Sequence, residues 1–236
     1  MCGRYSLFTP PDEIEDRFDA RFEVEFRPQY NLAPSQSLPV ITNDAPETIR
    51  ELEWGLLPAW ADDPDDGSGH INARAETIEE KPTFATSAEQ RRCLVVADGF
   101  YEWVEGDDGS QPYRVAFQDD RPFAMAGLWE RWEGTREQVG LDAFGGGGAA
   151  DPDTEVKETF AIVTVEPNDL VADLHHRMAA ILPHGREREW LRADDPDRRS
   201  ELLEPHPDDE LRAYPVSTAV NDPTNDGPEL IESVAP

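Results

Sequence analysis

Lysine, cysteine and long hydrophobic runs are all scarce in this 236-residue chain. The two cysteines, Cys2 and Cys93, are too few for a disulfide framework and lack the spacing of a metal site. No apolar stretch approaches the roughly 18 residues of a membrane-spanning helix, and no apolar segment typical of a secretory signal follows Met1. The sequence therefore predicts a protein without structural disulfides, membrane spans or a secretory leader.

Positive charge is scarce as well. Lysine and arginine total 21 against 51 acidic residues, which gives a net charge of −30, and only Lys81 and Lys157 are lysines. Six tryptophans and ten phenylalanines distinguish the chain from an acidic disordered one. Such a surface repels itself unless salt screens it, so we expect a halophilic source with a salt-rich cytoplasm. Taken alone, the charge argues against a nucleic-acid partner.

Strand-like runs fill the middle of the chain, and helical patterns frame its ends. This order predicts an α+β fold with a curled, barrel-like, mostly antiparallel β-sheet flanked by helices. We expect one domain over residues 1–236, with mobile low-complexity loops at 62–69 and 140–155. The predicted strands cover 38–42, 50–56, 93–97, 113–117, 122–129, 160–165 and 214–217, and the predicted helices cover 167–174, 185–193 and 198–203.

Two further local patterns predict structure. The segment 9–13 is typical of a helix start, and Ile14, Phe18 and Phe22 recur at the spacing of one buried helical stripe. The composition of residues 105–110 is typical of a hairpin turn.

Cys2 becomes the first residue if Met1 is removed, as is usual before a small second residue. It would then carry two nucleophiles, a thiol of ordinary pKa about 8.5 and an α-amine of about 7.7–8.0, both easily deprotonated near neutral pH. Such a 1,2-aminothiol can condense with an aldehyde to a Schiff base and close a thiazolidine ring on the same carbon. The alternative is a small apolar residue near a terminus.

Asn72 and Glu102 are further candidates. An asparagine amide can hold an amine in place, although a turn or helix-cap role is the alternative for Asn72. Glu102 lies between two aromatic residues at the end of the strand that starts at Cys93. A carboxylate there can have a raised pKa and act as a general acid or base, or it can simply face solvent.

The adjacent His175 and His176 are candidates for moving protons near neutral pH, or are ordinary structural histidines. Tryptophans can stack on bases, with core packing as the alternative, and arginines can bind phosphates or pair with carboxylates. The residues concerned are Trp54, Trp60, Trp103, Arg4, Arg74 and Arg177.

Taken together, these motifs resemble the SRAP family, the SOS response-associated peptidases or abasic-site processing proteins. The matching blocks follow the family's order across nearly the whole chain. They are Met1-Cys2-Gly3-Arg4-Tyr5, Tyr30-Asn31-Leu32-Ala33-Pro34, residues 54–60, 71–77 and 97–103, His175-His176-Arg177-Met178, Pro215-Val216-Ser217, and Asn221 ahead of residues 227–231.

The resemblance implies a protein that recognises abasic sites in single-stranded DNA and forms a thiazolidine crosslink through Cys2 after Met1 removal. Asn72 would position the Cys2 amine, and Glu102 would move protons and support strand cleavage as a lyase. His175 would assist sugar ring opening and crosslink reversal. By the same resemblance Arg4, Arg74 and Arg177 would hold phosphates, and Pro34, Trp60 and Trp103 would line the groove.

The resemblance also implies peptidase activity toward Met1. We further expect no metal or cofactor, and a monomer, since a single DNA-binding groove needs no second copy. We expect the protein in the cytoplasm, joining the nucleoid on damaged DNA. We hypothesise that the carboxylates cover the back and edges, leaving the motif arginines in one positive groove. Ala179 replaces the family's usual proline, which puts the loop of His175 in doubt, and His176 leaves the choice of histidine open. Two alternatives remain, an N-terminal-nucleophile amidohydrolase and a non-covalent single-strand-binding module.

Overall fold

The computed structural model describes residues 2–62, 69–106, 109–135 and 154–235. The elements follow one another as β1 (Tyr5–Leu7), α1 (Pro11–Phe18), β2 (Arg21–Phe22), β3 (Gln29–Leu32), β4 (Ser37–Thr42), β5 (Thr48–Trp54), β6 (Asn72–Arg74), η1 (Ala75–Thr77), α2 (Ala85–Gln90), β7 (Arg92–Ala97), β8 (Gly99–Gly106), β9 (Gly109–Phe117), β10 (Phe123–Thr135), β11 (Thr154–Val165), α3 (Asp169–Ala172), β12 (Met178–Ala179), α4 (Glu187–Arg192), α5 (Pro196–Leu202), η2 (Asp208–Glu210), β13 (Leu211–Pro215), η3 (Thr218–Asn221) and η4 (Pro228–Ile231), where η marks a 3-10 helix.

Five strands close into a barrel. β11, β10, β7, β4 and β5 pair in that order as antiparallel neighbours, and β5 returns to β11 in a parallel pairing at Trp54 and Phe160. A second, antiparallel sheet runs in the order β13, β9, β8, β1 and β3. The predicted α+β fold with a curled, mostly antiparallel sheet is therefore confirmed.

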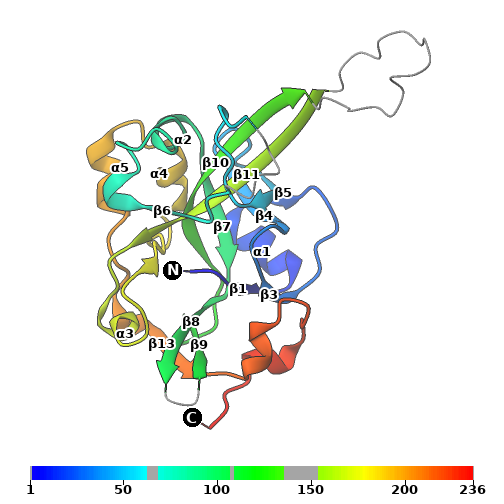
Figure 1. Cartoon of the computed structure of the whole chain (residues 1–236), viewed down its shortest axis with the longest axis vertical. Coiled ribbons are helices and arrows are strands. Elements are labelled where there is room, and N and C mark those ends of the chain that lie inside the picture. Colours follow the sequence, from blue (N-terminus) through cyan, green and yellow to red (C-terminus); the bar gives the residue numbers. More distant parts are fainter. Residues whose placement is uncertain (1, 63–68, 107–108, 136–153, 236) are drawn as a thin grey trace, which may run out of the picture.

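Apolar side chains fill the barrel, and helices cover one side of it. Trp54 and Phe160 are fully buried and stack with their ring centroids 6.2 Å apart. The helices α2, α4 and α5 gather on one side of the barrel, and the C-terminal 3-10 helices η3 and η4 lie beside β1 and β3 (Figure 1). Trp190 of α4 is fully buried, and its indole N–H donates to the Cys93 carbonyl at 3.1 Å. The two free cysteines are both buried.

Most predicted strands and the three late helices match observed elements, with shifted ends. The last strand begins at Leu211 and ends at Pro215 rather than covering 214–217. The helix near the N-terminus buries Ile14 and Phe18 as predicted but ends there, because Asp19 adopts a left-handed backbone with φ of 50°. Phe22 therefore lies in β2, where it stacks on Phe26 at 5.0 Å.

The predicted mobile loops lie mostly outside the described residues. Of the segment 62–69 only Asp62 and Gly69 are described, and of 140–155 only Thr154 and Glu155, which begin β11. The predicted hairpin is confirmed, because β8 and β9 pair from Phe100 as far as Gly106 opposite Gly109. Within the described part of the chain, no helix is long and apolar enough to cross a membrane.

Candidate active site

Cys2 lies inside the molecule, just ahead of β1. Its side chain is fully buried, and its thiol lies 3.9 Å from the Arg4 carbonyl oxygen. Burial raises the pKa of the thiol far above its usual range, and the nearby Glu102 carboxylate raises it further. The expectation of an easily ionised thiol is therefore wrong for this state, because a buried thiolate next to a carboxylate is disfavoured. Met1 lies outside the described residues.

Asn72 contacts Cys2 directly. It is the first residue of β6, which runs parallel to β11 with Asn72 opposite Ile162. Its amide nitrogen donates to the Cys2 carbonyl oxygen at 2.9 Å. Its amide oxygen is buried without a hydrogen-bond partner among the described residues. The amide thus fixes the Cys2 backbone and keeps one acceptor open inside the site.

Glu102 comes from the strand next to Cys2. The structure corrects its predicted place, because it lies in the separate strand β8 rather than at the end of the strand that starts at Cys93. Tyr5 pairs with Phe100 in the β1–β8 ladder, and this antiparallel register brings Glu102 toward the residues just before β1. Glu102 is only 2% exposed, and burial raises the pKa of its carboxyl to about 7.

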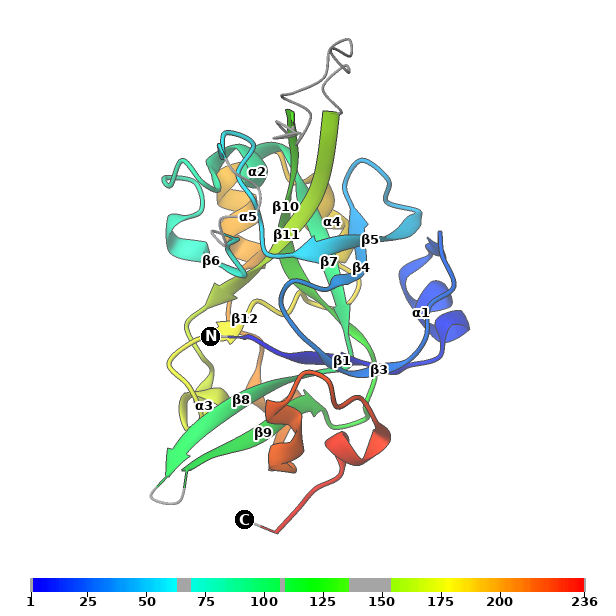
Figure 2. The ribbon, with the colours of Figure 1, turned by 45° about the vertical axis from the view of Figure 1, so that its right-hand side comes forward.

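His175 lies between α3 and β12. His175 Nδ1 lies 3.0 Å from both the backbone nitrogen and the carbonyl oxygen of Arg177, and burial lowers the pKa of the imidazole below 6.5. His176 is exposed, with its ring centroid 4.2 Å from that of His175. Ala179 stands in β12 opposite Thr164 of β11. In both ribbon views β12 lies beside the chain segment that leads into β1 (Figures 1 and 2).

β11 therefore connects two parts of the site. Its Thr164 pairs with Arg74 of β6 on one side and with Ala179 of β12 on the other. β6, which begins with Asn72, and β12, which follows His175, are therefore both paired with Thr164 of the barrel.

Arg177 is engaged by a carboxylate. It is 6% exposed, and its guanidinium donates to both Glu76 carboxylate oxygens at 2.8 and 2.9 Å and to the Thr164 carbonyl at 2.6 Å. This geometry matches the ion-pair interpretation of the residue. A phosphate contact by Arg177 requires this pair to open.

The other predicted DNA-contacting residues differ in exposure. Arg74 is exposed, Trp60 is 65% exposed, and Pro34 is half-buried. Arg4 donates to Asn31 Oδ1 at 2.7 Å and to the carbonyls of Val220 and Asn221.

The tryptophans divide between core and surface. Trp54 is fully buried in the core, in agreement with the core-packing alternative to base stacking. Trp103 is partly exposed, and its indole N–H donates to Asn221 Oδ1 at 2.7 Å.

Sequence reasoning missed a buried ionic network beneath the site. Asp98 is fully buried between β7 and β8 and accepts hydrogen bonds from the Ser6 hydroxyl and from the backbone N–H groups of Phe8 and Thr9. Arg114 pairs with it at 3.3 Å. In the sequence, the only indication of this network was the carboxylate of Asp98 directly after the apolar run 93–97. The neighbouring residues did not identify its partners.

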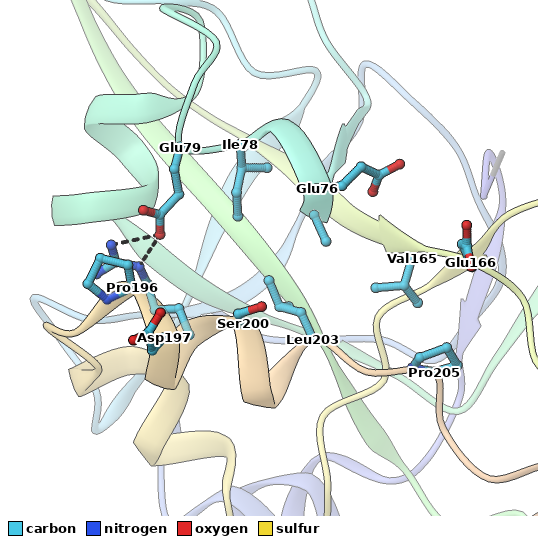
Figure 3. A pocket seen from close by; sticks show the side chains of 12 residues that line it. Glu76, Ile78, Glu79, Val165, Glu166, Pro196, Asp197, Ser200, Leu203 and Pro205 are labelled. Atoms are coloured by element: carbon cyan, nitrogen blue, oxygen red, sulfur yellow. Dashed lines mark hydrogen bonds and ion pairs between the residues drawn. The ribbon is translucent and has the colours of Figure 1, made fainter.

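A cavity of about 510 Å³ lies next to the Arg177–Glu76 pair. Figure 3 shows the apolar side chains of Ile78, Val165 and Leu203 with carboxylates around them. None of the four catalytic candidates lines it, and its carboxylates would repel a phosphate backbone, so we assign no DNA contact to it. The acidic lining residues are Glu76, Glu79, Glu166 and Asp197. No group of three potential metal ligands occurs in the part of the chain that the structure describes.

Comparisons with known proteins agree on one family. The family model described as SOS response associated peptidase (SRAP) matches residues 1–223. The abasic site processing protein YoqW of Bacillus subtilis is 41% identical over 99% of this chain and its own full length. The abasic site processing protein HMCES of Xenopus tropicalis is 28% identical over 99% of this chain and 78% of its own.

Solved structures show the same fold. A crystal structure of a protein from Bacteroides thetaiotaomicron superposes with a TM-score of 0.82 at 26% identity, covering 99% of this chain and 100% of its own. A second, from Bordetella bronchiseptica, has a TM-score of 0.72 at 26% identity and covers 92% of this chain and 100% of its own. The family match, the sequence relatives and the fold lead to one conclusion: the chain belongs to the SOS response associated peptidase (SRAP) family.

Proposed function

We propose that this protein recognises abasic sites in single-stranded DNA and links covalently to them through Cys2 once Met1 is removed. Its relatives in Bacillus subtilis and Xenopus tropicalis are named abasic site processing proteins. The observation that carries the proposal is the convergence of Asn72 and Glu102 on Cys2, the one residue whose amine and thiol can together capture an aldehyde.

The proposed reaction begins at the Cys2 amine. The amine attacks the aldehyde carbon of the ring-opened sugar, and loss of one water gives a Schiff base. The thiol sulfur then adds to the same carbon and closes the thiazolidine ring, while a base carries the thiol proton to the former imine nitrogen, which becomes the ring N–H. The net change joins protein and sugar and releases one water.

Glu102 is suited to both proton transfers. Because its pKa is about 7, protonated and ionised forms are both populated near neutral pH. The protonated form can assist loss of water from the first adduct. The ionised form can take the proton of the Cys2 thiol, which burial keeps protonated. One buried carboxyl group thereby serves as acid and then as base.

Asn72 and His175 have distinct roles in this proposal. The Asn72 amide nitrogen holds the Cys2 carbonyl, and its unpartnered oxygen can accept a hydrogen bond from the Cys2 amine. His175 Nδ1 lies 3.0 Å from both the backbone nitrogen and the carbonyl oxygen of Arg177, and these contacts orient the ring. The imidazole can exchange a proton with the sugar ring oxygen during ring opening and assist crosslink reversal.

The strand would follow exposed residues around this site. Arg4 and Arg74 hold phosphates, Arg177 joins them when it leaves Glu76, and Pro34, Trp60 and Trp103 support splayed bases. The protein would act as a monomer in the cytoplasm and join the nucleoid at damaged DNA. Lyase cleavage 3′ to the lesion and removal of Met1 by the protein itself belong to the same proposal.

A denaturing gel tests the covalent step. The purified Met1-free protein is mixed with a single-stranded oligonucleotide that carries one abasic site, and a shifted band that survives boiling is expected. Cys2→Ala and a form that retains Met1 should both lose the band. Cys93→Ala, a change at the second buried cysteine, should retain it.

Other outcomes overturn the proposal. No band from verified Met1-free protein would refute crosslinking. A band that Cys2→Ala retains would place the attachment elsewhere, and equal binding of intact and abasic strands without a band would indicate the non-covalent single-strand binder.

A further inference from the structure

Asn221 lies between two of the residues proposed to contact DNA. Its side-chain oxygen accepts the indole N–H of Trp103 at 2.7 Å. Its backbone carbonyl accepts from Arg4 Nη2 at 3.3 Å. Asn221 is exposed, and no proposed step uses it. Asn221 thus contacts both Arg4, which we propose binds a phosphate, and Trp103, which we propose stacks on a base.

The backbone around Asn221 is held in place from below. Asn31, which is 3% exposed, donates from its amide nitrogen to the carbonyls of Val220 at 3.2 Å and Asp222 at 3.0 Å. The same nitrogen donates to the Asn225 carbonyl at 2.9 Å. Both neighbours of Asn221 are therefore fixed, so the residue needs little ordering when a ligand binds.

The direction of the Asn221 amide follows from its partner. An indole N–H can only donate, so the amide oxygen faces Trp103 and the NH₂ group faces away from it. The described part of the chain offers this nitrogen no hydrogen bond, and the side chain is exposed. Two donor hydrogens are thus presented to solvent beside Arg4 and Trp103.

We infer that Asn221 donates a hydrogen bond from Nδ2 to a phosphate oxygen of the bound single strand, at the nucleotide whose base stacks on Trp103. The inference rests on the proposed function and adds a binding residue to it. Hydrogen bonds to phosphate from asparagine side chains are a normal part of DNA recognition and position the strand without reading its sequence.

The local charge favours a neutral donor at this position. The Asp222 carboxylate accepts the backbone N–H of Thr224 at 2.9 Å and its hydroxyl at 2.8 Å, and these bonds hold its pKa below its usual value. Asp222 therefore stays ionised close to Arg4 and offsets part of the arginine's attraction for phosphate. An amide supplies a contact that the neighbouring carboxylate does not neutralise.

Binding of an unmodified, fluorescently labelled single-stranded DNA of about 12 nucleotides tests this contact by anisotropy. We expect Asn221→Ala to weaken binding roughly tenfold. Asn221→Asp keeps the oxygen that Trp103 needs but loses the donor, so it should weaken binding at least as much. The same two changes at Asn43, whose oxygen accepts the Trp129 indole N–H at 3.0 Å, serve as controls and should leave affinity unchanged.

Salt and sequence dependence identify the kind of contact. A neutral donor releases no counterion, so Asn221→Ala should leave the slope of log affinity against log salt unchanged. Arg4→Gln should reduce the magnitude of the slope by about 0.7. The loss at Asn221 should be equal for oligo-dT and oligo-dA, because phosphates are common to both.

Three results would overturn the inference. They are full binding by Asn221→Asp, a loss that differs between oligo-dT and oligo-dA, and a changed salt slope for Asn221→Ala. If the wild-type protein formed no crosslink with an abasic strand, the proposed function itself would fail, and this outcome differs from a selective null result at Asn221.

Discussion

Glu102 illustrates what burial does to a single carboxyl group. In the unfolded chain this group ionises near 4.5, whereas in the folded protein its pKa is about 7. Between these values the folded state binds more protons than the unfolded state, so stability falls as the pH rises through this window. Ionised Glu102, the residue that we assign to proton transfer, thus lowers the free energy of unfolding above neutral pH.

Replacement of Glu102 by glutamine should therefore increase stability while it decreases the crosslinking rate. We expect Glu102→Gln to raise the free energy of unfolding at pH 8 by roughly 2–3 kcal/mol and to flatten its dependence on pH between about 4.5 and 7. Crosslinking should slow by about a hundredfold. Urea unfolding at several pH values and timed gels measure both, and a variant that is less stable than wild type at pH 8 would contradict this account.

The sequence identified candidate residues for the site but did not predict their surroundings. The chemistry of an aminothiol singled out Cys2, but the raised pKa of its thiol depends on burial in the folded protein and on Glu102, which comes from a distant segment. The contact of Asn72 with the Cys2 carbonyl and the pair of Arg177 with Glu76 likewise join residues far apart in the chain. Such contacts arise from tertiary packing, which no local pattern encodes.

At the scale of elements, long apolar runs were predictable, whereas the shortest strands and the eight-residue strand β8 were not. The long runs in β7, β10 and β11 show β propensity through their own composition. The two- to four-residue strands β1, β3, β6 and β12 exist because neighbouring strands offer them partners. Three of these short strands help to position the candidate site: β1 follows Cys2, β6 begins with Asn72, and β12 follows His175.

The Arg177–Glu76 pair joins η1 to the segment before β12, so its loss should affect the fold as well as binding. Arg177→Gln should lower the free energy of unfolding by about 1–2 kcal/mol, because the Glu76 carboxylate and the Thr164 carbonyl lose their largely buried guanidinium partner. Arg74→Gln, at an exposed arginine of β6, should leave stability within about 0.5 kcal/mol of wild type.

DNA binding should separate the same two variants. Arg74→Gln should reduce the magnitude of the salt slope of single-strand binding by about 0.7. Thermal unfolding and anisotropy provide the two measurements. An Arg177 variant with unchanged stability would show that the pair contributes nothing to holding the segment that carries His175.

At the scale of the whole molecule, the net charge of −30 opposes both compaction and DNA binding. Screening relieves the self-repulsion, so the melting temperature should rise between about 0.2 and about 2 M KCl. Non-covalent binding should change in the opposite direction. If three arginines contact phosphates, affinity falls with a salt slope of about −2, or roughly a hundredfold for each tenfold rise in salt.

A covalent bond escapes this conflict, because added salt cannot dissociate it. Crosslink already formed should therefore persist when KCl is raised from about 0.2 to about 2 M, while binding to intact strands is lost. Disappearance of preformed crosslink at high salt, followed on denaturing gels, would contradict a covalent product.

Mass spectrometry of the crosslinked peptide tests the central claim most directly. After nuclease and protease digestion, the account predicts a modified N-terminal peptide that begins at Cys2, lacks Met1, and carries the sugar remnant minus one water. Fragmentation should place the added mass on Cys2 itself. A sugar remnant on any other residue, or on a peptide that still begins with Met1, would contradict the assignment of the aminothiol as the reacting group.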